Sequence, residues 1–151
     1  MYVILVKHKW TSGTGWIIRT VTGSIYTHAA IMTDNGAVYD SSEKKGGVTF
    51  RGKLSVFDER QVVIFYVESD KEVLYKKIDK TLGTKYDWKG VFGWLFKAQD
   101  KNKFYCFEYV WEILREIGNT SEVRVRTDAN DILKHLSNAN YVGKAKDWKL
   151  V

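Results

Sequence analysis

The stretch "HAAIMTDNGAVYD", residues 28–40, decides the fold. The mostly apolar run "HAAIMT" is followed by the turn-forming "DNG" and then by a second run, "AVYD". Asn35-Gly36 is a dipeptide that accepts the positive φ angles of a tight primed turn, and both flanking runs have strand character. The stretch predicts a β-hairpin with His28 and Asp40 close to opposite each other at its open end.

The segments around this hairpin predict further strands and several helices. The unbroken apolar run Val62–Val67 is typical of a strand covered on both faces. Ser69 with Glu72 forms a capping box that opens a helix, and Gly118 ends the helix that contains Cys106. The predicted strands are 2–7, 48–57, 61–68 and an edge strand at 122–126; the predicted helices are 13–24 (a short helix or turn), 69–83, 87–97, one ending at 118, and a final one at 127–138. This order predicts an α+β domain with a mostly antiparallel sheet and helices packed on it.

The composition is that of one folded domain covering residues 1–151, because 44% of the residues are hydrophobic and 15% aromatic. A single cysteine excludes an internal disulfide and a cysteine-rich zinc site. No apolar run is long enough for a signal peptide or a membrane span, so we expect a cytoplasmic product, or one delivered to the cell envelope by other means. The net charge of +6 favours an anionic partner such as a membrane surface, whereas no motif supports binding of nucleic acid.

The only cysteine lies in "KFYCFEYVWEIL", residues 103–114, at the start of a predicted helix. Free cysteines are often small buried hydrophobes, which is one interpretation of Cys106. The other is a nucleophile, because the N–H groups and the dipole at a helix start stabilise a thiolate. A base, a group that orients the base, and an oxyanion donor elsewhere in the fold would favour the second interpretation.

His28 is the candidate base. It opens a strand and is followed by small residues that leave room for access. Asp40 is placed to fix the tautomer of its imidazole, although Asp40 also suits a strand-end cap. His8 is expected at the surface, between Lys7 and Lys9, and His135 on the solvated or half-buried side of its helix, beside Lys134.

Four segments resemble NlpC-type papain-like cysteine hydrolases. "THAAIMTDNGAVYDSS" resembles the strand opened by the catalytic histidine, "GTKYDWKG" the segment before the nucleophile, and "YCFEYV" the nucleophile helix. "GWIIRTVTGSIYTH" resembles the helix and turn before the histidine in the YiiX-like group. The histidine precedes the cysteine, which is the circularly permuted order of YiiX-like bacterial hydrolases and lecithin retinol acyltransferase-like enzymes. The resemblance covers roughly residues 1–117 and implies a papain-like α+β fold.

The resemblance implies a site in which His28 activates Cys106, Asp40 holds His28, and the oxyanion meets the Cys106 N–H. The family's motif tyrosine corresponds to Tyr86, which on its own could equally be a core aromatic. The residue after the nucleophile is usually small in the family, whereas here it is phenylalanine. No metal or cofactor is implied. The residues expected to contact substrate are Tyr26, Thr27, Trp88 and Phe107.

Three functions follow. The first is a cysteine amidase or endopeptidase that acts on peptidoglycan-type peptides through a thioester. The second is a lipid- or thioester-directed acyl hydrolase or acyltransferase. The third is a non-catalytic binding module on the same fold. The predicted helix 87–97 is apolar on nearly every face, so it is either wedged in the core or lines an acyl groove or a membrane-contacting lip.

Overall fold

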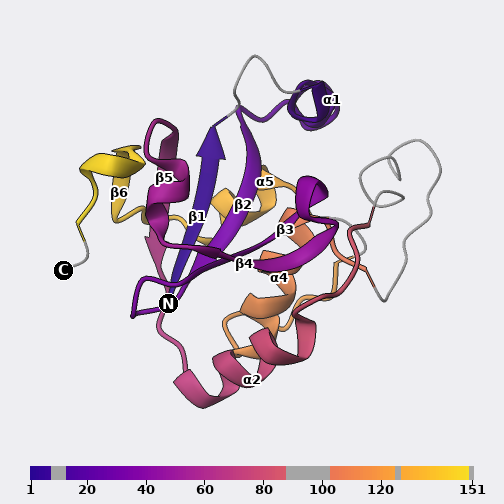
Figure 1. Cartoon of the computed structure of the whole chain (residues 1–151), viewed down its shortest axis with the longest axis vertical. Coiled ribbons are helices and arrows are strands. Elements are labelled where there is room, and N and C mark those ends of the chain that lie inside the picture. Colours follow the sequence, from indigo (N-terminus) through magenta and orange to yellow (C-terminus); the bar gives the residue numbers. More distant parts are fainter. Residues whose placement is uncertain (8–12, 88–102, 125–126, 150–151) are drawn as a thin grey trace.

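The computed structural model describes residues 1–7, 13–87, 103–124 and 127–149. At its centre is a six-stranded sheet in the order β4-β3-β2-β1-β5-β6, in which each neighbouring pair is antiparallel (Figure 1). The strands are β1 (Tyr2–Lys7), β2 (Tyr26–Met32), β3 (Val38–Ser42), β4 (Gly47–Gly52), β5 (Gln61–Tyr66) and β6 (Tyr141–Lys144). The α-helices are α1 (Gly13–Thr22), α2 (Lys71–Thr81), α4 (Cys106–Glu116) and α5 (Ala129–His135), and the 3-10 helices are η1 (Glu43–Lys45), η2 (Leu54–Phe57) and η3 (Ala145–Asp147). The predicted α+β class with an antiparallel sheet is confirmed.

Both faces of the central strands are buried. Successive side chains of a strand point to opposite faces, so each central strand contributes residues to two separate core clusters. One face packs against α4, which contacts β2 and β3. The other face packs against Phe57 of η2. The larger cluster takes Val3, Leu5, Ala29, Ile31, Val63 and Phe65 from the strands, and the smaller takes Ile4, Val6, Ala30, Met32, Val62 and Ile64. The prediction that the strand beginning at Val62 is covered on both faces is confirmed.

The predicted hairpin is present as β2 and β3, with Ile31 paired to Tyr39. Its turn lies one residue earlier than expected. The Gly36 N–H donates to the Thr33 carbonyl at 2.9 Å, so Asp34 and Asn35 are the central residues. Gly36 follows them with a φ of 83°, which a residue without a Cβ adopts at no steric cost.

Two β-bulges interrupt the ladders beside this hairpin. Between β1 and β2 the register passes from Val6–His28 to Lys7–Tyr26, which leaves Thr27 as the extra residue. Between β3 and β4 it passes from Tyr39–Phe50 to Val38–Gly52, which leaves Arg51 as the extra residue. A bulge bends its strand and turns a side chain to a new direction.

Several boundaries differ from the predictions. Helix α2 is capped by Asp70, not Ser69, because the Asp70 carboxylate accepts the N–H groups of Glu72 and Val73 at 2.8 and 3.1 Å. The predicted strand 48–57 ends at Gly52 and is followed by η2. Residues 122–124 form no strand, and Arg124 instead pairs with Asp131 of α5. The helix at 127–138 is not the last element, because β6 follows and pairs with β5. The predicted helix 87–97 lies outside the described residues except for Asp87.

Candidate active site

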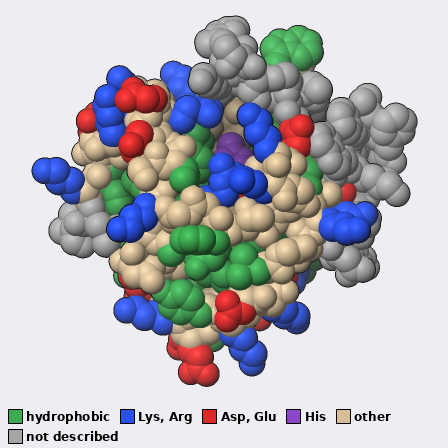
Figure 2. All heavy atoms as spheres, viewed as in Figure 1, with side chains coloured by type: hydrophobic (Ala, Val, Ile, Leu, Met, Phe, Trp, Pro, Cys, Tyr) green, Lys and Arg blue, Asp and Glu red, His purple; other side chains and the backbone are tan. Residues whose placement is uncertain are grey.

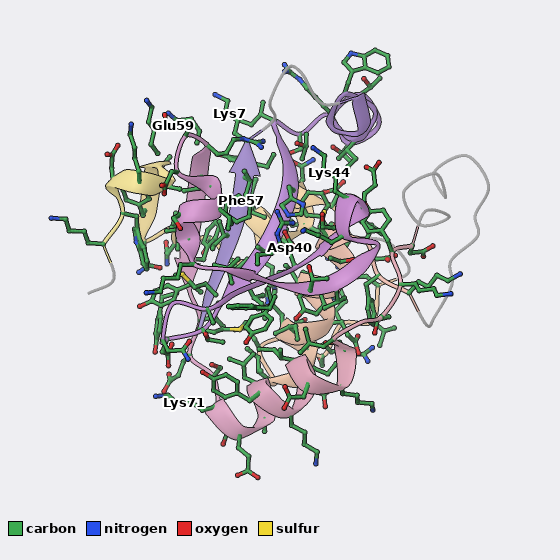
Figure 3. The ribbon with its side chains drawn as sticks, viewed as in Figure 1. Lys7, Asp40, Lys44, Phe57, Glu59 and Lys71 are labelled. Carbon is green, nitrogen blue, oxygen red and sulfur yellow. The ribbon has the colours of Figure 1, made fainter. Side chains whose placement is uncertain are left out.

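His28 and Asp40 come together from neighbouring strands. The Nε2 atom of His28, in β2, lies 2.6 Å from Oδ2 of Asp40, in β3. The Asp40 side chain is fully buried, whereas 24% of the His28 side chain is exposed. Figure 3 shows Asp40 beneath Phe57, whose ring centroid lies 6.0 Å from that of His28. The expected contact between this carboxylate and imidazole is therefore present.

Cys106 reaches the same histidine from the first residue of α4. Its thiol is free and buried, with 1% of the residue exposed. The Cys106 side chain lies near enough to the His28 imidazole to raise its pKa through hydrogen bonding and charge. The imidazole therefore has both the buried Asp40 carboxylate and the Cys106 thiol as neighbours.

The contacts of His28 favour its charged form. Burial of the imidazole lowers the pKa of His28, but hydrogen bonds to Asp40 and Cys106, together with the negative charges on these groups, outweigh burial. The net result is a rise in the pKa of His28 from 6.5 to about 10. A protonated imidazole beside the sulfur stabilises a thiolate by charge attraction. The site therefore favours the protonated imidazolium form of His28.

Tyr86 is fixed beside Cys106 by the backbone. The Tyr86 N–H donates to the Gly46 carbonyl at 2.9 Å, and Tyr86 forms a parallel bridge with Phe104. The Ser41 hydroxyl, from β3, donates to the Phe104 carbonyl at 2.5 Å. Burial raises the pKa of Tyr86, and the nearby charge of Cys106 adds to this rise. Tyr86 thus lies near enough to Cys106 for its charge to affect the Tyr86 pKa, while donation of the Tyr86 hydroxyl to an oxyanion stays a prediction.

Arg51 is a member of the site that the sequence did not reveal. Its Nη1 lies 3.1 Å from Oδ2 and 3.3 Å from Oδ1 of Asp40. The Arg51 side chain is 23% exposed. Pairing the predicted strands around residues 40 and 49 would have placed Arg51 near Asp40, but the bulge that turns its side chain has no clear signature in the sequence.

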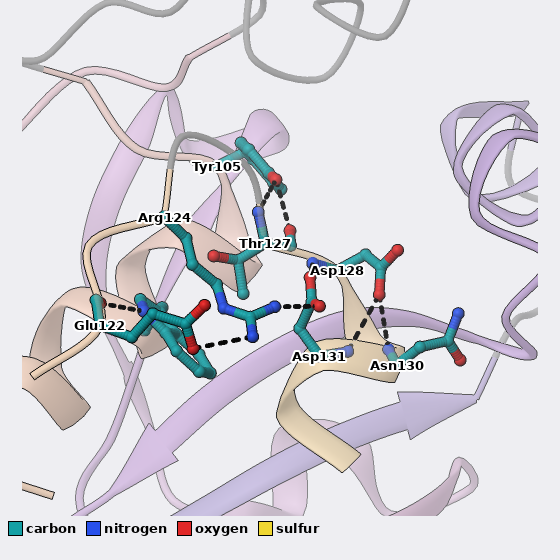
Figure 4. A network of polar contacts seen from close by, with 8 residues as sticks. Tyr105, Glu122, Arg124, Thr127, Asp128, Asn130 and Asp131 are labelled. Atoms are coloured by element: carbon teal, nitrogen blue, oxygen red, sulfur yellow. Dashed lines mark hydrogen bonds and ion pairs between the residues drawn. The ribbon is translucent and has the colours of Figure 1, made fainter. Parts of the chain in front are cut away.

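The start of α4 is held in place by a second polar network (Figure 4). The Tyr105 hydroxyl donates to the Thr127 carbonyl and accepts the Thr127 N–H at 3.1 Å. The buried Glu108 carboxylate accepts the Tyr105 N–H at 3.3 Å, so it closes the first turn of α4. Arg124 pairs with Asp131 of α5 and lies over the ring of a tryptophan of α4, with its Cζ 4.6 Å from the centroid. These contacts tie the helix that carries the thiol to α5.

Of the four residues expected to contact substrate, the three that the structure describes differ in how deeply they are buried. Tyr26 is half-buried and Thr27 is buried, both just before His28. Phe107 is 1% exposed and belongs to the larger core cluster. Trp88 lies outside the described residues. Contact with substrate stays a prediction for all four.

His135 is separate from this site. His135 is half-buried and its Nε2 lies 2.8 Å from Oδ1 of Asn119. His8 lies outside the described residues. Figure 2 shows Lys and Arg side chains spread over the face in view instead of gathered in one block, with an apolar patch in its lower half. Within the part of the chain that the structure describes, no helix is long and apolar enough to cross a membrane.

Comparison with known proteins supports the fold. No family model matches the chain, and no curated protein matches it. A crystal structure of the metalloprotein YiiX from Escherichia coli O157:H7 (DUF1105) is similar, with 20% sequence identity and a TM-score of 0.60. The match covers 79% of this chain and 66% of the YiiX chain. Among the residues described for this chain, no group of three or more His, Cys, Asp or Glu side chains could hold a metal ion. The likeness shows that this chain has a YiiX-like α+β fold.

Proposed function

We propose that this protein is a cysteine hydrolase that cleaves an amide or ester through a thioester on Cys106. The observation that carries the proposal is that the His28 imidazole contacts the buried Asp40 carboxylate and has the Cys106 thiol as a second neighbour. This is the nucleophile, base and orienting group that acyl transfer needs, on three separate elements of the fold. A papain-like, circularly permuted relationship is part of this proposal.

In the first half-reaction the Cys106 thiolate attacks the carbonyl carbon of the substrate, and a C–S bond forms as the carbonyl π electrons move to oxygen. The N–H groups at the start of α4 lack partners within the helix and receive this oxyanion, with Tyr86 beside them. The C–N or C–O bond then breaks. The leaving group takes a proton from the His28 imidazolium, and a thioester and a neutral imidazole remain.

In the second half-reaction the neutral imidazole of His28 accepts a proton from water as the water oxygen attacks the thioester. The C–S bond breaks, and its electron pair returns to sulfur as a thiolate. The acid product leaves, and the thiolate–imidazolium pair is restored. Asp40 stabilises the imidazolium before acylation and after deacylation, and fixes the ring that exchanges the protons.

The substrate that we favour is a peptidoglycan-type peptide, and the fold likeness to YiiX does not bear on this choice. Dispersed phospholipids are the competing substrate class. Both classes present a carbonyl that a thiolate can attack, so the distinction requires an assay.

The test begins with alkylation of Cys106, the only cysteine of the chain, by iodoacetamide at pH 7. We expect labelling of the folded protein to be faster than labelling of the same thiol in urea, and slower by tenfold or more in His28→Ala. His135→Ala is the matched control, because it removes a histidine away from the site. Labelling no faster than in urea, or unaffected by His28→Ala, would contradict a thiol activated by His28.

Hydrolysis is then measured on peptidoglycan fragments and on dispersed phospholipids, with Cys106→Ser as the inactive variant. Release of new amino groups that is lost in Cys106→Ser supports the peptidase. Release of fatty acid that is lost in the same variant would move the assignment to lipid acyl hydrolysis. Rapid labelling with no hydrolysis of either substrate would favour a binding module.

A further inference from the structure

The buried carboxylate of Asp40 serves two cations. Its Oδ2 accepts from His28 at 2.6 Å and from Arg51 at 3.1 Å, and its Oδ1 accepts from the same Arg51 nitrogen at 3.3 Å. The carboxylate is fully buried, whereas the side chains of His28 and Arg51 are 24% and 23% exposed. The two cations therefore compete for one negative charge.

Arg51 reaches this position because of the bulge in β4. The extra residue lies between Phe50 and Gly52, which pair with Tyr39 and Val38. Gly52 has a φ of 98°, which a residue with a Cβ rarely adopts. The backbone of β4 is thus adapted locally next to Arg51, the residue that touches Asp40.

The proposed reaction makes two opposite demands on His28. Acylation needs an imidazolium that stabilises the thiolate and then gives its proton to the leaving group. Deacylation needs a neutral imidazole that takes a proton from water. A carboxylate that paired with His28 alone would favour the charged form throughout and would slow the second step. A permanent positive charge on the same carboxylate weakens that preference.

We propose that Arg51 is a positioning residue of the thiol site: by sharing Asp40 with His28, its guanidinium limits how strongly Asp40 holds the imidazolium and so lets His28 act as a base in deacylation. This inference rests on the proposed cysteine hydrolase function. Arg51 acts through Asp40, which its guanidinium contacts directly. The groups that face His28 are Asp40 from β3, Cys106 from α4 and the apolar ring of Phe57 from η2, with Arg51 behind Asp40.

The test measures the pKa of His28 by NMR in a Cys106→Ser background. The hydroxyl carries no charge, as the sulfur of a thioester carries none, so the titration reports the state in which His28 must act as a base. We compare Arg51→Gln, which keeps a hydrogen-bond donor but no charge, with Arg51→Lys, which keeps the charge. Arg115→Met is the matched control, since it breaks an ion pair with Glu112 on α4.

Loss of the Arg51 charge should raise the pKa of His28 by about 1 unit or more, because a like charge near the imidazolium has been removed. Arg51→Lys should stay within about 0.3 units of the parent, and Arg115→Met should not change it. An unchanged or lowered pKa in Arg51→Gln would overturn the inference. Arg51→Met is a second uncharged variant; failure of both uncharged variants to fold, with Arg115→Met folded, would show a purely structural residue and also overturn it.

Activity provides an independent reading. In the chain with Cys106 intact, Arg51→Gln should shift the pH profile of hydrolysis to higher pH by the same amount as the NMR titration. If the wild type hydrolyses no substrate, the proposed function fails while the titration still reports on Arg51. If hydrolysis occurs but neither the profile nor the titration responds to Arg51→Gln, the inference on Arg51 alone is wrong.

Discussion

Replacement of Asp40 by Asn should destabilise the fold in a way that depends on pH. The substitution keeps the shape of the side chain but removes the buried charge that pairs with His28 and Arg51. The pKa of His28 should then fall from its value of about 10, because burial still lowers it while the hydrogen bond to a carboxylate is gone. The free energy of unfolding and the protonation of His28 should change together, since both depend on the Asp40 carboxylate.

The magnitude follows from linkage. Folding raises the pKa of His28 from 6.5 to about 10, so the native state keeps a proton that the unfolded chain releases above pH 6.5. The resulting stabilisation is fully present below pH 6.5 and is lost as the pH rises through about 10. The rise in the pKa of His28 corresponds to a stabilisation of the native state by about 4 kcal/mol at pH 7 and about 1 kcal/mol at pH 9. Asp40 shares this stabilisation with Cys106, so these figures are upper bounds on the part that Asp40→Asn removes through His28.

The assay is urea denaturation of the wild type and Asp40→Asn at pH 6, 7, 8 and 9, followed by tryptophan fluorescence. The difference in the free energy of unfolding should be largest at pH 6 and should shrink towards pH 9. Glu116→Gln is the control, because it removes an ion pair with Lys77 from a side chain that is 44% exposed. This exposed pair should contribute about 1 kcal/mol or less, with no trend over this pH range. A difference between wild type and Asp40→Asn that stays constant from pH 6 to pH 9 would refute the coupling of His28 to Asp40.

Three further substitutions test the supports of the site, each by the free energy of unfolding in urea. Gly47→Ala should cost about 2–3 kcal/mol or more, because the φ of Gly47 is 153° and a Cβ would lie 1.9 Å from the Thr84 carbonyl oxygen; a cost below about 0.5 kcal/mol would contradict this close approach. Ser41→Ala should cost about 1–2 kcal/mol through loss of its 2.5 Å hydrogen bond to the Phe104 carbonyl, and it should also slow alkylation of the thiol; a loss of stability with unchanged alkylation would separate the two effects. Tyr105→Phe should cost about 1–3 kcal/mol, because it leaves two buried backbone groups without their partner; full stability would show that water replaces the hydroxyl.

The sequence predicts the central part of the site because that part depends on local patterns. Apolar runs on either side of a turn set the hairpin, and the hairpin brings His28 to Asp40. The turn itself was placed one residue too late, since Asp34, Asn35 and Gly36 all tolerate turn conformations and only the register of the strands chooses among them. The same ambiguity explains the cap of α2, where two adjacent residues are both good caps.

Features that depend on distant contacts could not be predicted. Strand β6 is short and alternates weakly, and it forms because β5 offers an edge to pair with. Arg51 lies within a predicted strand, and a single bulge decides whether its side chain faces solvent or Asp40. The contact of Cys106 with His28 depends on how α4 packs against β2, which the order of motifs suggested only through a family resemblance.

The parallel bridge between Tyr86 and Phe104 has a consequence for how such a site can diversify. The Asp87 N–H donates to the Phe104 carbonyl at 3.2 Å, so the chain leaves this point and returns to it. A closed excursion of this kind can change in length without moving its two ends, and each doubling costs only about 0.6 kcal/mol in closure entropy. Evolution or a designer can therefore lengthen or shorten the interval between these ends while the thiol stays in register with its histidine.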